Sequence, residues 1–128
     1  LLIHRRLEEL RTYVARFLDV DSYCYHDAKY RYVELFSPNH KPLHISNYDI
    51  IARVDNSLVV NFIMVIAVEF DGGIEPYSCL LQARYNKGSV EFNVSERESH
   101  WTLELDKVTV QIFKKIKQSL SFNPLRLR

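Results

Sequence analysis

A run of thirteen residues at positions 58–70, LVVNFIMVIAVEF, constrains this chain more than any other feature. Nearly every position is apolar, and the β-branched side chains favour a strand over a helix. Successive side chains of a strand point to opposite faces, so this strand needs cover on both of them. Fully extended it would span about 43 Å, longer than most strands, and we expect a bend near Asn61. Its length, together with Asn61 and Glu69, excludes a membrane span.

The two faces of this run have different neighbours. One face consists of Leu58, Val60, Phe62, Met64, Ile66, Val68 and Phe70, and the other is dominated by Val59, Ile63, Val65 and Ala67. In the segments that follow, apolar residues (Tyr77, Cys79, Leu81 and Ala83; Val90, Phe92 and Val94) alternate with polar ones (Ser78, Gln82 and Arg84; Glu91 and Asn93). We therefore expect one face of the sheet to be apolar throughout and the other to be apolar only along its middle. That middle strip is either covered by the loop at 37–49 or left for a partner.

Length and composition indicate one domain, residues 1–128, with a substantial core. Of the 128 residues 47% are hydrophobic, and the aromatic residues comprise eight tyrosines, seven phenylalanines and one tryptophan. With 17 basic and 16 acidic residues the chain has no net field that would draw it to nucleic acid or to a membrane. Two cysteines without a short spacing are typical of an intracellular protein. The chain opens on LLIHRR and carries no signal peptide, so we expect it to be cut from a longer intracellular protein.

Amphipathic helices are predicted at both ends of the chain. At 1–18 the apolar positions recur at spacings of four and three, which is the a/d pattern of a helix seam: Ile3, Leu7, Leu10, Val14 and Phe17. No capping residue precedes this pattern, so we expect a helix or coiled coil upstream; alternatively, the stripe covers the domain's own sheet. The second helix is predicted to start at Asp106 as its N-cap and to end at Asn123-Pro124. Its apolar stripe is Val108, Ile112, Phe113, Ile116 and Leu120, with Lys107, Lys114, Lys115 and Lys117 toward solvent.

Between the helices the sequence predicts strands at 30–36, 50–54, 58–70, 77–85 and 90–94. The last two flank Asn86-Lys87-Gly88, a strong hairpin signal in which the glycine supplies a positive φ. The predicted fold class is thus α+β: an antiparallel four- to five-stranded meander flanked by an N-terminal and a C-terminal helix.

No motif for catalysis, cofactor or metal binding accompanies this architecture. His40 and His44 are separated by Pro42, which prevents a helical i,i+4 pair, and Cys24 with His26 lacks a second pair of ligands. Cys79 lies in an apolar strand register, which is typical of an inert buried thiol. Three glycines are too few for a phosphate-binding loop. We therefore predict that the chain is not an enzyme and binds no cofactor and no metal.

Two polar features remain as candidate contact residues. The C-terminal lysines, among them Lys114 and Lys117, could contact phosphates or an acidic partner, but such clusters are more often a solubilising helix face. The tyrosines near Lys29 and Arg31, among them Tyr30 and Tyr32, could stack on bases, but core and edge tyrosines explain them as well. Binding to nucleic acid is the less favoured interpretation.

The order of helix, antiparallel meander and helix resembles the RWD domain. The segment at 63–85, IMVIAVEFDGGIEPYSCLLQARY, is similar to the RWD hairpin in which a hydrophobic strand leads through a turn and a proline into the next strand. The segment at 108–122, VTVQIFKKIKQSLSF, is similar to the closing helix of the RWD heads of kinetochore scaffold proteins. The YPxxPP signature of many RWD domains is absent, and Glu75-Pro76-Tyr77 matches it in part.

The resemblance implies a non-enzymatic protein-binding module that dimerises or docks neighbours through a sheet face or a helix. We therefore predict a subunit of a larger nuclear assembly, foremost a kinetochore or centromere complex, that forms a homodimer or heterodimer. The alternatives are a subunit of an mRNA-export complex and a cone-shaped NTF2- or cystatin-like domain that holds a small ligand. The candidate partner-binding residues are Val59, Ile63, Val65, Tyr30, Tyr32, Lys114 and Lys117.

Overall fold

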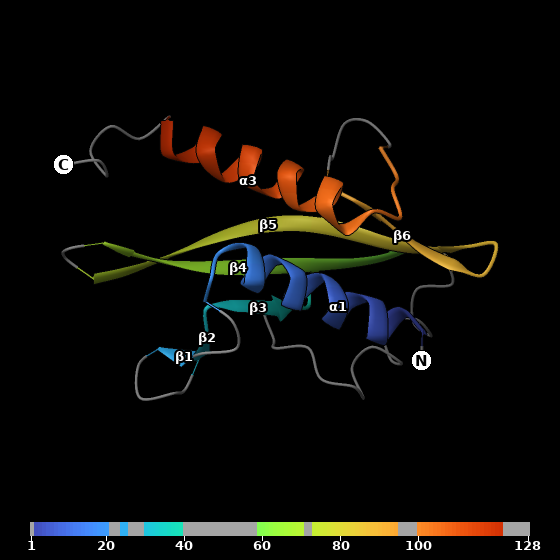
Figure 1. Cartoon of the computed structure of the whole chain (residues 1–128), viewed down its shortest axis with the longest axis horizontal. Helices are drawn as coiled ribbons and strands as arrows, with labels where there is room; N and C mark the ends of the chain where they lie inside the picture. Colours follow the sequence, from blue (N-terminus) through green and yellow to red (C-terminus); the bar gives the residue numbers. More distant parts are fainter. Residues whose placement is uncertain are drawn as a thin grey trace.

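The computed structural model describes residues 2–20, 24–25, 30–39, 59–70, 73–94 and 100–121. In chain order the elements are α1 (Leu2–Phe17), β1 (Cys24–Tyr25), β2 (Tyr30–Arg31), β3 (Val33–Phe36), β4 (Val59–Phe70), β5 (Gly73–Asn86), β6 (Ser89–Asn93) and α3 (Leu105–Ser121). The main sheet is antiparallel with the order β3-β4-β5-β6, and β1 pairs with β2 separately (Figure 1). The predicted α+β class, a four-stranded antiparallel sheet flanked by the two helices, is confirmed. None of the helices in these ranges is long and apolar enough to cross a membrane.

The predicted long strand is β4, which pairs with β5 along its whole length. The register runs from Val59 opposite Arg84 to Phe70 opposite Gly73. Pairing continues through Asn61, opposite Gln82, so the bend expected there does not interrupt the ladder. This twelve-residue strand is one of the two central strands of the sheet, because β3 pairs with its other edge.

β5 begins at Gly73, four residues before the predicted start at Tyr77, and includes Pro76. A proline lacks the backbone N–H that a ladder needs, so it is tolerated where that position points away from a neighbouring strand. The N–H of Ala67, opposite Pro76, donates to the carbonyl of Tyr32 on the other side of β4. The Ala67–Pro76 pair therefore exchanges no hydrogen bonds, and the proline nitrogen points to the outer edge of β5, where β6 does not reach.

The predicted hairpin between β5 and β6 is confirmed, with Asn86 opposite Ser89 across a two-residue turn. Lys87 has a φ of 52° and Gly88 a φ of 83°. Two successive positive φ values define the turn type whose twist matches that of a hairpin. The sequence indicated a positive φ at Gly88, but it did not indicate that Lys87 also adopts this strained backbone conformation.

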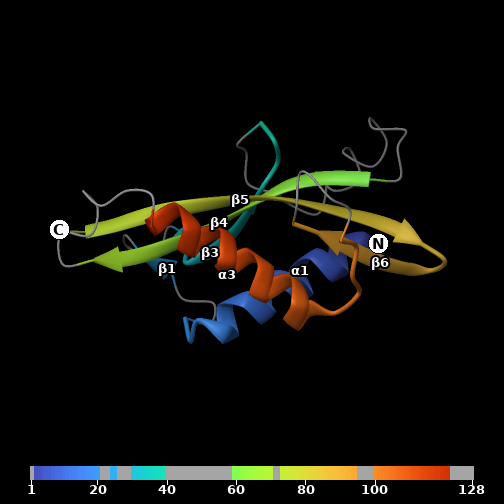
Figure 2. The same ribbon diagram turned by 90° about the horizontal axis from the view of Figure 1, so that it is seen from above.

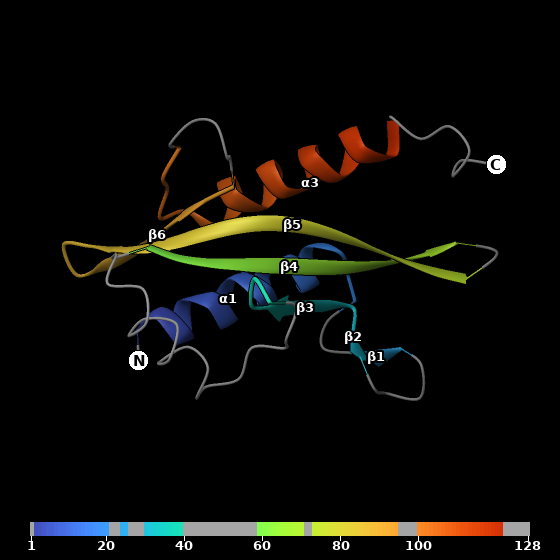
Figure 3. The same cartoon turned by 180° about the vertical axis from the view of Figure 1, so that it is seen from behind.

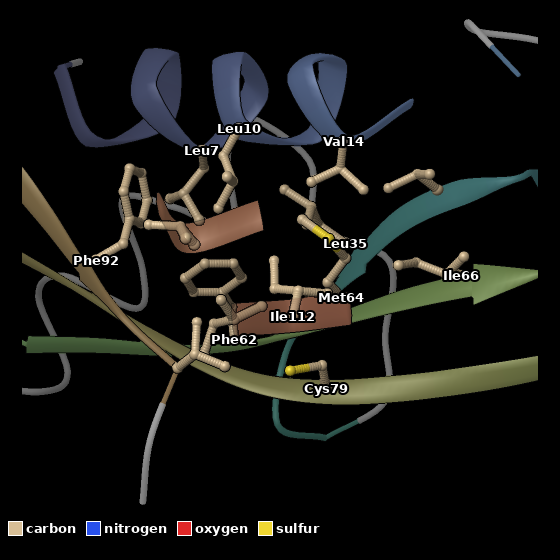
Figure 4. Close-up of a cluster of buried hydrophobic side chains, with 14 of the residues drawn as sticks. Leu7, Leu10, Val14, Leu35, Phe62, Met64, Ile66, Cys79, Phe92 and Ile112 are labelled. Atoms are coloured by element: carbon tan, nitrogen blue, oxygen red, sulfur yellow. The ribbon is translucent and has the colours of Figure 1, made fainter. Parts of the chain in front are cut away.

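Both helices cover the same face of the sheet and build the core. The a/d residues Leu7, Leu10 and Val14 of α1 are fully buried against β3, β4 and β6 (Figure 4). Val108 and Ile112 of α3 join the same cluster. α1 and α3 run in the same direction (Figure 1), and from above α1 and the start of α3 lie on one side of the strands (Figure 2). The seam from Leu7 to Val14 therefore covers the domain's own sheet, whereas Phe17, the last residue of the predicted seam, is 61% exposed and does not.

Two predicted boundaries need correction, and three predicted segments lie outside the described residues. α3 starts at Leu105, so Asp106 lies in its first turn and is not the N-cap; the carbonyl of Glu104 accepts the N–H of Val108 instead. The predicted strand at 30–36 is divided at Tyr32 into β2 and β3. The predicted strand at 50–54, the loop at 40–49 and the helix end at 123–124 lie outside the described residues.

Candidate protein interface

The sheet face opposite the helices, here named the open face, carries side chains in cross-strand rows. Paired residues of neighbouring strands point to the same side, so the register fixes which side chains are adjacent. The rows are Glu34–Val65–Ser78, Phe36–Ile63–Leu80, Asn61–Gln82–Asn93 and Val59–Arg84–Glu91. Figure 3 shows the molecule from this side, with α1 behind the strands.

Four apolar side chains of the open face form a continuous surface, here named the sheet strip: Phe36, Ile63, Val65 and Leu80. Phe36, Ile63 and Leu80 make one row across three strands, and Val65 is two residues from Ile63 on the same face of β4. Phe36, Ile63 and Val65 are half-buried, and Leu80 keeps 38% of its surface exposed. In contrast, Phe62 and Met64, on the helix side of the same strand, are fully buried.

A hydrogen-bonded row of amides, Asn61–Gln82–Asn93, borders the sheet strip as the next row along the strands. The Gln82 Nε2 donates to Asn61 Oδ1 at 3.0 Å, and the Asn93 Nδ2 donates to Gln82 Oε1 at 3.1 Å. The backbone N–H of His100 donates to Asn93 Oδ1 at 3.3 Å. Asn93 is 3% exposed, so these bonds satisfy amide groups that would be costly to bury alone.

Beyond the amide row, a charged pair and an aromatic ring cover the end of the open face. The Arg84 Nε donates to Glu91 Oε1 at 2.8 Å, and the Arg84 guanidinium lies 4.1 Å from the centroid of the Trp101 ring. The Asn86 Nδ2 donates to the same carboxylate oxygen at 3.1 Å. The hydrogen bond from Arg84 is the main reason that the pKa of Glu91 lies below its ordinary value; desolvation opposes it, and the hydrogen bond from Asn86 and the charge of Arg84 add to the lowering.

On the side of β3, an ion-pair network borders the sheet strip. Arg31 forms a two-nitrogen pair with the carboxylate of Glu34, its Nε lying 2.9 Å from Glu34 Oε2. Glu8 of α1 lies within 4.0 Å of the Arg31 guanidinium and 3.1 Å from the Nε of Arg11. The network connects the edge of the sheet to α1 and leaves the sheet strip as an apolar surface between two polar borders.

The structure divides the candidate partner-binding residues between two surfaces. Val59, Ile63 and Val65 lie half-buried on the open face, but the amide row separates Val59 from the other two. Lys114 and Lys117 are exposed on α3, which covers the opposite face of the sheet.

The two tyrosines of the candidate set contribute less. Tyr32 lies between β2 and β3. Its carbonyl accepts the Ala67 N–H, and its side chain is half-buried. The side chain of Tyr30 lies outside the described residues. Sequence reasoning missed Phe36 and Leu80, although alternation with the buried Leu35, Cys79 and Leu81 would have placed both on the open face.

Other chemistry in the described part of the chain is limited. The described ranges hold no group of three or more His, Cys, Asp or Glu side chains that could bind a metal. Cys79 is 3% exposed, and its thiol lies 3.9 Å from the Leu80 carbonyl. A depression of about 650 Å³, lined by charged and polar side chains including His4, Glu9 and Arg16, lies on the outward side of α1. It is not in the space between helix and sheet where a cone-shaped binding domain holds its ligand.

Comparisons with protein-family models, with curated proteins and with solved structures give no match to this chain.

Proposed function

We propose that this chain is a non-enzymatic protein-interaction module that binds a protein partner through the sheet strip. The observation that carries the proposal is the row Phe36–Ile63–Leu80 with Val65, an incompletely buried apolar surface on the sheet face that the helices do not cover. Covering four such side chains would contribute on the order of several kcal/mol of association free energy. The polar borders on both sides match the usual interface, which has an apolar centre and a hydrogen-bonded rim.

The resemblance to the RWD domain extends this proposal to a cellular setting. The order of α1, the antiparallel meander and α3 supports it, because RWD heads have the same order of elements. On this basis we propose a subunit of a nuclear assembly, foremost a kinetochore or centromere complex, with an mRNA-export complex as the alternative. The partner would be a second copy or a different subunit.

The test uses the full-length protein purified with its bound subunits from its native source at high salt. Val65→Glu places a charge in the sheet strip, and we expect it to release a subunit that the unaltered protein retains. Leu80→Lys is the second variant. We expect it to fold, because the Leu80 side chain is already 38% exposed. Tyr85→Glu is the matched control, a 40% exposed aromatic outside the strip that should release nothing.

Circular dichroism establishes that each variant is folded. If Leu80→Lys and Val65→Glu are folded, and both retain every subunit and the oligomeric state of the unaltered protein, the sheet strip is not the interface.

A further inference from the structure

A second apolar surface lies on the outward side of the helix layer, away from the open face. Among the described residues, the most exposed large apolar side chain is Phe17 of α1, with 61% of its surface accessible. Val110 of α3 is 49% exposed and Tyr13 of α1 is 37% exposed. These side chains are on amphipathic helices whose buried stripes already fill the core, so the core does not account for them.

A ring contact connects the exposed apolar side chains of α1 to those of α3. The ring of Phe17 stacks on Phe113 with the centroids 5.0 Å apart and an interplanar angle of 29°. Tyr13 precedes Phe17 by four residues and Val110 precedes Phe113 by three, so each pair shares a helix face. We name Tyr13, Phe17, Val110 and Phe113 the helix patch. The stack joins the two helices, yet more than half of Phe17 remains accessible.

The rim of the helix patch is basic. Arg16, Lys114 and Lys117 are exposed one to four residues from its members. Residues 107–121 of α3 contain four lysines and no acidic residue, and residues 10–17 of α1 contain two arginines and no acidic residue. The nearest acidic residues in the sequence are Glu9, four residues before Tyr13, and Asp19, two residues after Phe17 and beyond the end of α1.

The depression on the outward side of α1 continues this surface. Tyr13 and Arg16 line it, and it extends to Leu105 at the start of α3. Its two carboxylates are already compensated: Glu9 lies 2.6 Å from the Arg6 guanidinium and Glu8 lies 3.1 Å from the Arg11 Nε. The patch and the depression therefore offer apolar contacts beside an excess of positive charge.

We propose that the helix patch binds an amphipathic helix with acidic flanks, contributed by another protein. α1 and α3 lie side by side and run in the same direction, so a third helix laid on the Phe17–Phe113 pair would extend an existing helical layer (Figure 2). Its apolar stripe would cover the four members of the patch, and its acidic flanks would face Arg16, Lys114 and Lys117. This binding uses none of the sheet-strip residues and holds whether or not the sheet strip has a partner.

The test selects ligands from a displayed library of randomised helical peptides of about 20 residues, because isolated helices shorter than roughly 12–15 residues are only marginally stable. We expect the enriched peptides to combine an apolar stripe with acidic flanks. Phe17→Glu and Lys114→Glu, both at exposed positions, should each weaken their binding by about tenfold or more, as measured by fluorescence anisotropy. The matched controls are Tyr85→Glu, an exposed aromatic elsewhere, and Lys87→Glu, a charge reversal at an exposed position of the turn between β5 and β6, outside both the helix patch and the depression. Both controls should bind as the unaltered protein does.

Three results would overturn the proposal. The first is that the library yields no enriched peptide. The second is that the enriched peptides bind folded Phe17→Glu and Lys114→Glu as tightly as the unaltered protein. The third is that a single-stranded RNA oligonucleotide binds the patch in preference to the peptides, because the patch would then be a nucleic-acid site. Val65→Glu, altered on the opposite face, should bind the peptides normally, which separates this proposal from that for the sheet strip.

Discussion

Phe62 and Ile63 are consecutive residues of β4, yet their environments differ completely. Phe62 is fully buried beneath α1 and α3, in the cluster that contains Leu10 and Ile112. Ile63 points to the open face, where it pairs across the ladders with Phe36 and Leu80 and remains half-buried. From the Ile66–Tyr77 row to the Val60–Ala83 row the helix-covered face is apolar, whereas the open face changes from apolar to amide to charged rows along the strands.

This difference indicates that the two faces have separate roles. Removing a side chain from the helix-covered face leaves a cavity that the packed core cannot refill, so stability depends on it. On the open face, the same removal exposes little new surface, and the hydrogen-bonded rows hold their geometry without it. The open face can therefore vary in its chemistry while the helix-covered face preserves the fold.

The largest expected effect compares two phenylalanines on the two faces. Phe62→Ala should lower the free energy of unfolding by about 3–5 kcal/mol, because it creates a cavity in the packed core. Phe36→Ala, on the open face, should cost about 1 kcal/mol, since its ring is already partly solvated. Urea denaturation followed by circular dichroism measures both. Equal losses would mean that the two faces do not differ in packing.

A smaller effect is expected at the amide row. Asn93→Ala, at a residue that is 3% exposed, removes the acceptor of the His100 N–H and the donor to Gln82 Oε1, and should cost about 1–3 kcal/mol because two hydrogen bonds are lost. Asn61→Ala, at the half-buried end of the row, removes a single acceptor and should cost less. If Asn61→Ala lowers the free energy of unfolding more than Asn93→Ala does, the buried end of the row at β6 does not contribute the larger share of its stability.

The smallest effect concerns pH. Arg84 and Asn86 hold the pKa of Glu91 below its ordinary value, so the ionised carboxylate stabilises the folded state. That contribution is present above the unfolded pKa of about 4.3 and is lost as the pH falls through the lower folded value. The denaturation midpoint of the unaltered protein should therefore fall more between about pH 7 and about pH 3 than that of Glu91→Gln. Asp19→Asn, at an exposed carboxylate that forms no ion pair with the described residues, is the control and should keep the full pH response. Identical pH responses of Glu91→Gln and the unaltered protein would show that the Arg84 pair adds no stability.

Much of the fold followed from periodicity. A period of two in the strand segments assigned Tyr77, Cys79 and Leu81 to the buried face, and the spacing of three and four along α1 identified Leu7 and Leu10 as its buried side. These predictions succeed because a strand or helix alone fixes which side chains share a face. The extension of β5 past Pro76 was missed, because whether a proline is tolerated depends on which edge of the strand has a neighbour.

The candidate site was harder to predict. Leu80 alternates with buried neighbours and could have been assigned to the open face, but its contact with Ile63 and Phe36 depends on the register of three strands. The candidate partner-binding set combines Lys114 with residues of β4, although α3 places Lys114 on the other side of the sheet. The amino-acid sequence does not determine on which face of the sheet a helix packs, so it does not determine on which side of the molecule a residue of that helix lies.

The sequence by itself determined the elements, the two faces of the long strand and the apolar stripes of both helices, because these depend on local periodicity. The tertiary structure decided which stripe is covered, since the parallel packing of α1 and α3 on one face buries Phe62 and leaves Ile63 half-buried. It also brought Phe17 against Phe113, a contact between residues at opposite ends of the chain. The physical reason is that burial depends on the arrangement of distant elements, which no local pattern specifies.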